Sequence, residues 1–216
     1  MTPEDLIAFI DESKKPARDP RTGKVSGQGD FYVVASAVVL RGDVEMTRQA
    51  LTSAVDRLGF PLHYSELRSG RRKVAAISAV MAIDDWDALV VETSRALPPR
   101  GHSEHHVRAR ILRQAFAELN TQGGVFDITL ESRAARGRGL DQLDLKDHQV
   151  LQSLIAARQV SGSLRIAHAT KSEPLLWIAD LVAGARSDLL CGRDRETYGL
   201  VSERVRKTTQ VVWGRP

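Results

Sequence analysis

The sequence predicts an α/β fold in which a mixed sheet of about five strands is flanked by helices. Two short apolar runs, LIAFID from Leu6 and FYVVASAVVL from Phe31 to Leu40, are rich in β-branched and aromatic residues and are typical of buried strands. Segments with helical periodicity then alternate with further strand-like runs. The chain has 216 residues, of which 42% are hydrophobic, so we expect a single domain over residues 1–216.

The stretch SKKPARDPRTGKVSGQGD, residues 13–30, separates the first two predicted strands. It is rich in Pro, Gly, Lys and Arg and has no apolar periodicity, which predicts a hairpin with a long, mobile, basic loop. Because Lys and Arg contacts to phosphates carry the affinity for nucleic acids, we expect this loop to meet a polyanion. The basic residues concerned are Lys14, Lys15, Arg18, Arg21 and Lys24.

Helices and strands alternate through the rest of the chain. Apolar residues at helical spacing predict helices over residues 44–59, 71–81, 103–124 and about 144–159. Strand-like runs begin near Trp86 and cover residues 125–133 and 163–169. The first three strands are therefore expected to be antiparallel, and the later ones to follow helices. A last helix contains LLWIADLVAGA, residues 175–185.

Asp180 lies in the middle of that otherwise apolar helix. A buried, ionised carboxylate costs several kcal/mol unless it is paired, hydrogen-bonded or bound to a metal, so Asp180 needs a partner. Two predicted strands end in acids, at Asp11 and Glu12 and at Glu131. Neighbouring strand residues point to opposite faces, so only one of Asp11 and Glu12 can face the helix, and Glu12 is interpreted as a flanking residue.

Several carboxylates that meet at one place repel each other unless a cation neutralises them. The hard ions Mg²⁺ and Mn²⁺ take oxygen ligands, and two of them about 3.5–4 Å apart form the clamp used in phosphodiester hydrolysis. The pattern therefore predicts a site for Mg²⁺ or Mn²⁺. Two alternatives need no metal. Asp180 could form a structural salt bridge, and Glu131 could form a surface ion pair with Arg133.

Three motifs, FIDES, LHYSELRSG and SEPLLWIADLVAGA, occur in this order along the chain. Together they resemble the bacterial and phage family known as domain of unknown function 3800, which has a ribonuclease H-like fold. The resemblance implies that Asp11, Glu131 and Asp180 hold the metals and that Glu66 is a possible fourth acid. The chain departs from the family at Lys14, where Gly is usual, and at Pro61, where an acid is usual.

Further candidates surround these acids in the sequence. His63 is expected to assist at the site together with Glu66, and His168 is a second candidate neighbour. The basic loop SRAARGRG directly follows Glu131, where substrate phosphates would pass if that acid binds metal. Its residues Arg133, Arg136 and Arg138 are therefore predicted to bind nucleic acid.

Composition and motif searches narrow the class of protein. Lys and Arg outnumber Asp and Glu by 31 to 27, a balance that is compatible with a polyanionic partner. A single cysteine and the absence of any apolar run of about 20 residues favour a cytoplasmic protein outside the membrane. Phosphate-binding glycine loops and serine-hydrolase motifs are missing, and Ser103 stands where a zinc protease pattern needs Glu.

These observations predict a metal-dependent nuclease that hydrolyses DNA or RNA. Two alternatives stay open at this point. One is a nucleic-acid-binding or assembly module of the same fold without turnover, and the other is a hydrolase of the glycosidase kind that uses two carboxylates and no metal.

Overall fold

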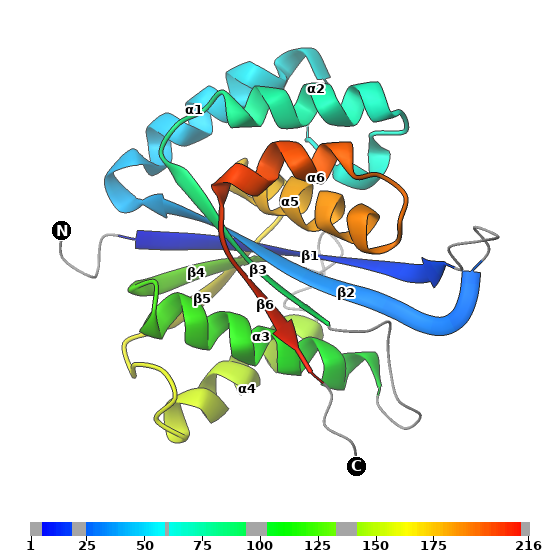
Figure 1. The fold of residues 1–216 in the computed structure, drawn as a ribbon. Helices are drawn as coiled ribbons and strands as arrows, with labels where there is room; N and C mark the ends of the chain where they lie inside the picture. The colour runs from blue at the N-terminus through cyan, green and yellow to red at the C-terminus, as the bar shows by residue number, and fades with distance from the viewer. Residues whose placement is uncertain (1–5, 19–24, 59–60, 94–102, 133–141, 213–216) are drawn as a thin grey trace.

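The computed structural model describes residues 6–18, 25–58, 61–93, 103–132 and 142–212 (Figure 1). Its strands are β1 (Leu6–Arg18), β2 (Val25–Leu40), β3 (Trp86–Thr93), β4 (Val125–Glu131), β5 (Arg165–Ala169) and β6 (Val205–Val211). Its α-helices are α1 (Val44–Val55), α2 (Gly70–Met81), α3 (Glu104–Thr121), α4 (Gln142–Ala156), α5 (Leu175–Leu190) and α6 (Glu196–Val201). None of the helices described is both long and apolar enough to cross a membrane.

The strands form one mixed sheet in the order β5-β4-β1-β2-β3-β6. Strands β1, β2 and β3 are antiparallel neighbours, whereas β4 and β5 run parallel to β1 and β6 runs parallel to β3. The predicted α/β class with a mixed sheet is confirmed, as is the change from antiparallel strands to alternating helices and strands. The sheet has six strands rather than five because β6 was not predicted, and neither was α6.

Helices cover both faces of the sheet (Figure 1). In the figure, α1, α2, α5 and α6 lie on one side of the strands, and α3 and α4 lie on the other. Alternation along β1 sends Phe9 into the core beneath α5 and Ile10 into the core beneath α3. Because the central strands are buried on both faces, they read as continuous apolar runs, which is how the sequence revealed them.

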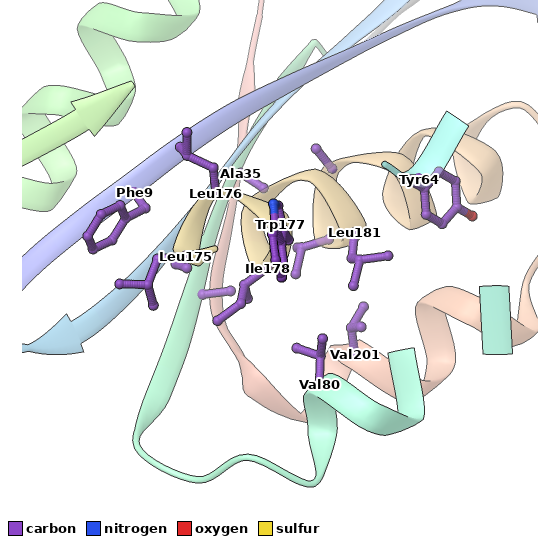
Figure 2. Close-up of a cluster of buried hydrophobic side chains, with 14 of the residues drawn as sticks. Phe9, Ala35, Tyr64, Val80, Leu175, Leu176, Trp177, Ile178, Leu181 and Val201 are labelled. Carbon is purple, nitrogen blue, oxygen red and sulfur yellow. The ribbon is translucent and has the colours of Figure 1, made fainter. Parts of the chain in front are cut away.

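Helix α5 packs across the centre of one face. Its residues from Leu175 to Ala185 are all buried, as expected for a helix that is apolar all round. Figure 2 shows the cluster that it forms with side chains from the sheet and from neighbouring helices. The labelled members are Phe9, Ala35, Tyr64, Val80, Leu175, Leu176, Trp177, Ile178, Leu181 and Val201.

The first two strands are longer than predicted. Residues 13–18 belong to β1 and residues 25–30 belong to β2, so the expected long loop over 13–30 is wrong for most of its length. The register runs from Leu6 opposite Leu40 to Pro16 opposite Asp30, and it becomes irregular before Arg18. A Pro- and Gly-rich segment can extend a hairpin because backbone pairing across two strands does not need apolar periodicity.

Candidate functional site

Asp180 has three polar partners where α5 crosses the sheet. The residue is 6% exposed. The Oδ2 atom accepts a hydrogen bond of 2.8 Å from the backbone N–H of Tyr64 and lies 3.0 Å from Nδ1 of His63. It also lies 3.3 Å from Nζ of Lys171. The buried acid that the sequence singled out is therefore paired, and its partners come from two segments, one with His63 and Tyr64 and one with Lys171.

Lys171 also brings Asp11 and Glu131 to this place. Its ammonium group donates a hydrogen bond to Oδ2 of Asp11 and lies 3.7 Å from Oε2 of Glu131. The three carboxylates of Asp11, Glu131 and Asp180, called the acid cluster below, thus surround one positive charge. Whether these residues bind metal stays a prediction.

Strand register explains why the first two acids meet. Strand β1 pairs with β4 as far as Ile10 opposite Leu130, so Asp11 and Glu131 come next on the two strands. The expectation that Asp11 ends its strand is wrong, because β1 continues to Arg18. Only β4 ends here, one position after its last pair with β1. Asp11 itself is 2% exposed.

Ionisation of the acid cluster is uneven. Burial raises the pKa of Asp11 well above its usual value, and the carboxylates of Asp180 and Glu131 add to this rise although Lys171 opposes it. Burial also acts to raise the pKa of Asp180, but the hydrogen bond from His63 and the charge of Lys171 hold that pKa below its usual range. One ammonium group therefore does not fully compensate three carboxylates, and the place favours additional positive charge.

Lys171 was missed from the sequence. It lies in the connection between β5 and α5, and its backbone oxygen accepts a 2.8 Å hydrogen bond from Nε1 of the buried Trp177. Glu173 in the same connection pairs with Arg48 of α1 at 2.7 Å. These contacts hold the connection in place. The signal that could have found Lys171 is its position just before the motif that contains Asp180.

Some residues of the segment LHYSEL contact the acid cluster and others do not. His63 faces Asp180, as predicted, and about a third of its side chain is exposed (36%). Glu66 is exposed, and in the part of the chain described no hydrogen bond or ion pair joins its side chain to the acid cluster. The structure thus does not bring Glu66 to the acids. Tyr64, between them, contributes its backbone N–H to Asp180.

The pH dependence of stability is expected to report the contact between His63 and Asp180. The hydrogen bond to Asp180 raises the pKa of His63, so the stabilisation is fully present below the unfolded value of about 6.5 and is lost as pH rises through the folded value. In EDTA, the free energy of unfolding lost in His63→Gln should therefore be larger at pH 5.5 than at pH 9. Urea titrations at both pH values measure it, with His105→Gln as an exposed control. An equal loss at both pH values would contradict the contact.

Gly184 of α5 is needed for Tyr64 to sit where it does. A Cβ atom at Gly184 would overlap the Tyr64 ring, whereas a Cβ at the helical Gly199 would meet nothing within 4 Å. We expect Gly184→Ala to destabilise the fold by about 1–3 kcal/mol or more through overpacking. Gly199→Ala should instead be neutral or stabilising by up to about 1 kcal/mol. Equal urea midpoints for the two variants would contradict the packing.

A second polar network lies on the opposite face of the same rim. Glu12 contacts Arg108 of α3 at 3.0 Å, and the Arg108 guanidinium also binds Asp147 of α4. His168 lies 3.1 Å from Asp147, so this predicted neighbour belongs to the other face. Glu12 is a salt-bridging residue, as it was interpreted.

This network contains a group of potential ligands. Among the residues described, the ligand atoms of Asp144, Asp147 and His168 all lie within 4.8 Å of one another. However, Arg108 already supplies a positive charge to Asp147, and its own pKa stays raised beside Glu12 and Asp147 despite its burial. An ion here would have to approach a guanidinium group, so we interpret the network as a structural ion-pair cluster.

Few of the predicted nucleic-acid-binding residues can be placed. Lys14 is exposed on β1, and Lys15 binds Asp188 of α5 at 2.6 Å. Arg18 belongs to β1, but its side chain lies outside the described residues. Arg21, Lys24, Arg133, Arg136 and Arg138 all lie outside them too.

Comparisons with known proteins do not assign the chain to a family. No protein-family model matches the chain, and no curated protein matches it either, so membership in the domain of unknown function 3800 family stays a prediction. A crystal structure of a glutamine-to-alanine variant of Bst-RNase HIII aligns at a TM-score of 0.44 and 14% identity, over 84% of this chain. The chain spans about half (51%) of that structure. This likeness carries no inference about activity.

Proposed function

We propose that this protein is a divalent-metal-dependent nuclease that hydrolyses phosphodiester bonds of DNA or RNA. The observation that supports it is the meeting of Asp11, Glu131 and Asp180 around one cationic group at the rim of the sheet. Acids whose pKa values are perturbed by burial and by neighbouring charges cluster at functional sites. The oxygen-only donor set fits Mg²⁺ or Mn²⁺ better than softer metals.

In this proposal the three carboxylates hold two ions. When bound, such ions supply Lewis acidity and lower the pKa of water, and both effects promote phosphodiester hydrolysis. Asp180 is kept ionised, and therefore ready to bind a cation, by its hydrogen bonds from His63 and Tyr64. Asp11 is the acid whose ionisation would gain most from added positive charge, because burial raises its pKa.

The chain's own residues have separate roles around the phosphodiester. His63 is partly exposed at the edge of the acid cluster, where it can hold or release a proton at Nε2 while Nδ1 stays bound to Asp180. The ammonium group of Lys171 has to leave the acids when ions bind, and a neighbouring phosphate oxygen is the natural new partner for it. Tyr64 keeps Asp180 oriented through its backbone N–H.

One observation favours a second function. Because Lys171 already places a positive charge among the three acids, the chain could retain the fold as a nucleic-acid-binding module without metal or turnover. In that case the ammonium group is the permanent partner of the cluster. Dependence on divalent ions separates the two functions.

The test is a cleavage assay with the full chain after EDTA treatment. Fluorescent single-stranded DNA, single-stranded RNA, duplex DNA and an RNA–DNA hybrid are each incubated with Mg²⁺, Mn²⁺ or Ca²⁺, or in EDTA. We expect cleavage of at least one substrate with Mg²⁺ or Mn²⁺ and none in EDTA. Binding without cleavage under every condition would favour the module, and cleavage that persists in EDTA would overturn the metal mechanism.

A further inference from the structure

A basic cavity of about 460 Å³ lies beside the acid cluster, at the far end of the segment that carries His63 and Tyr64. It is separate from the three acids, none of which lines it. The side chains that define it come from β1, α2, α5 and the adjoining loops. They are Lys15, Tyr64, Arg68, Lys73, Asp188 and Arg193.

Asp188 is a buried hydrogen-bond acceptor for three side chains that line this cavity. It is 1% exposed and accepts hydrogen bonds of 2.6 Å from each of Lys15 and Lys73. The Tyr64 hydroxyl donates a third bond to it, at 2.8 Å. The two ammonium groups lie 5.0 and 4.4 Å from the centre of the Tyr64 ring, within the range of cation–π attraction. Lys15 also donates a long hydrogen bond of 3.4 Å to the backbone oxygen of Gly184. Both lysines are thus held in fixed positions, and because an ammonium group has three N–H donors, each retains at least one donor for a ligand.

The cavity carries an excess of positive charge. Arg68 and Arg193 join the two lysines, whereas among the residues that the structure describes the acids lining the cavity are Asp188 and Asp194. The Asp194 carboxylate accepts hydrogen bonds from backbone N–H groups at the start of α6. Arg68 is exposed and has no ion pair with the residues described, and Arg193 lies 3.9 Å from Asp188.

Crowding of these cations is itself unfavourable. Burial lowers the pKa of Lys15, and the charges of Lys73 and Arg193 lower it further, although Asp188 opposes the change. An anion in the cavity would relieve this repulsion. The four cations come from separate parts of the chain. Arg68 and Arg193 are exposed, so a ligand from solvent can reach them.

The distance between the cavity and the acid cluster follows from residue spacing along α5 and β1. Asp188 follows Asp180 by eight residues on α5, which is about 12 Å at 1.5 Å per residue. Lys15 follows Asp11 by four residues on β1, which is about 13 Å at 3.3 Å per residue. Tyr64 connects the two places, because its N–H binds Asp180 and its hydroxyl binds Asp188. Even along the axis of a duplex one strand rises only about 3.4 Å per nucleotide, so this distance is longer than a single nucleotide step.

We propose that the basic cavity binds a backbone phosphate of a nucleic-acid strand, a few nucleotides from the phosphodiester held at the acid cluster. The proposal rests on the proposed function and names a second point of substrate contact. Phosphate contacts of this kind position a strand without reading its sequence. The cavity therefore selects a polyanion of several nucleotides over a mononucleotide.

The test compares two double variants with the same change in net charge. Arg68→Gln with Arg193→Gln removes the rim cations of the cavity, and Arg71→Gln with Arg72→Gln removes two exposed cations of α2 that do not line it. The probe is a fluorescein-labelled single-stranded DNA of 12 nucleotides, in EDTA across a salt series. We expect the cavity variant to bind about tenfold more weakly, with a salt slope lower by about 0.7, and the control to stay near wild type.

Other outcomes discriminate among the sources of phosphate. Equal affinities for the two double variants would overturn the cavity as a phosphate site, whatever the cleavage assay shows. A second outcome would also overturn the strand contact. If inorganic phosphate binds wild type but not the cavity variant, while both bind the 12-nucleotide probe equally well, the cavity is a site for free phosphate. Cavity-dependent binding in a protein that never cleaves would instead support the strand contact and remove only the nuclease activity.

Discussion

Asp180→Asn should lower metal-dependent cleavage by at least about a thousandfold while leaving the protein folded. The amide keeps the shape of the side chain and an oxygen for the N–H of Tyr64, but it removes the charge that a divalent ion needs. Several kcal/mol of transition-state stabilisation depend on such ions, and each 1.36 kcal/mol is a factor of ten in rate. Initial rates with Mn²⁺ on the substrate found in the assay above measure the loss.

The stability of the same variant distinguishes function from structure. Asn removes the attraction of Asp180 to Lys171 and His63, but it also removes the repulsion from Asp11 and Glu131. The two effects oppose each other, so we expect the free energy of unfolding in EDTA to change by no more than about 1 kcal/mol, or about 2–4 °C in melting temperature. A much larger loss would mean that Asp180 is a structural ion-pair residue.

Asp144→Asn is the matched control, because Asp144 is a buried acid on the opposite face. Cleavage by this variant should stay close to that of wild type. If Asp144→Asn abolished cleavage and Asp180→Asn did not, the metal site would be the group of Asp144, Asp147 and His168 instead.

Lys171→Met should destabilise the protein by about 3–5 kcal/mol in EDTA, the usual cost of leaving buried charges without their partner. The substitution removes the only ammonium group that contacts all three acids in the part of the chain described. Divalent ions should restore most of this loss, because an ion that binds only the folded protein stabilises it in proportion to the logarithm of its concentration. Urea titrations with increasing Mn²⁺ measure both effects.

Wild type and Lys171→Arg are the controls for that measurement. In wild type the ammonium group competes with the ion, so Mn²⁺ should raise the unfolding midpoint less than it does in Lys171→Met. Lys171→Arg keeps the charge and should recover most of the stability in EDTA. A loss in Lys171→Met that is the same with and without Mn²⁺ would show that Lys171 is a structural partner of the acids and that no divalent ion replaces it.

Local pattern was enough to predict most of the fold. Apolar runs predicted β1 to β5, and apolar residues at helical spacing predicted α1 to α5. Each of these elements packs into the core with its own apolar residues, which leave a periodic pattern in the sequence. Strand β6 was not predicted because its residues, VRKTTQV, are mostly polar and lie at the sheet edge. The hairpin was predicted too short because its outer part is held by pairing between strands, which leaves no local signature.

The sequence by itself determined that Asp180 needs a partner, since a charge inside an apolar helix is costly wherever the helix packs. It also indicated Asp11 and Glu131, because each follows an apolar strand-like run, although β1 does not end at Asp11. Only the tertiary structure decided that Lys171 lies among them, that Glu66 does not, and that Lys15 and Lys73 share Asp188. Those contacts join residues up to 173 positions apart, and their geometry depends on how α5 crosses the sheet rather than on any local pattern.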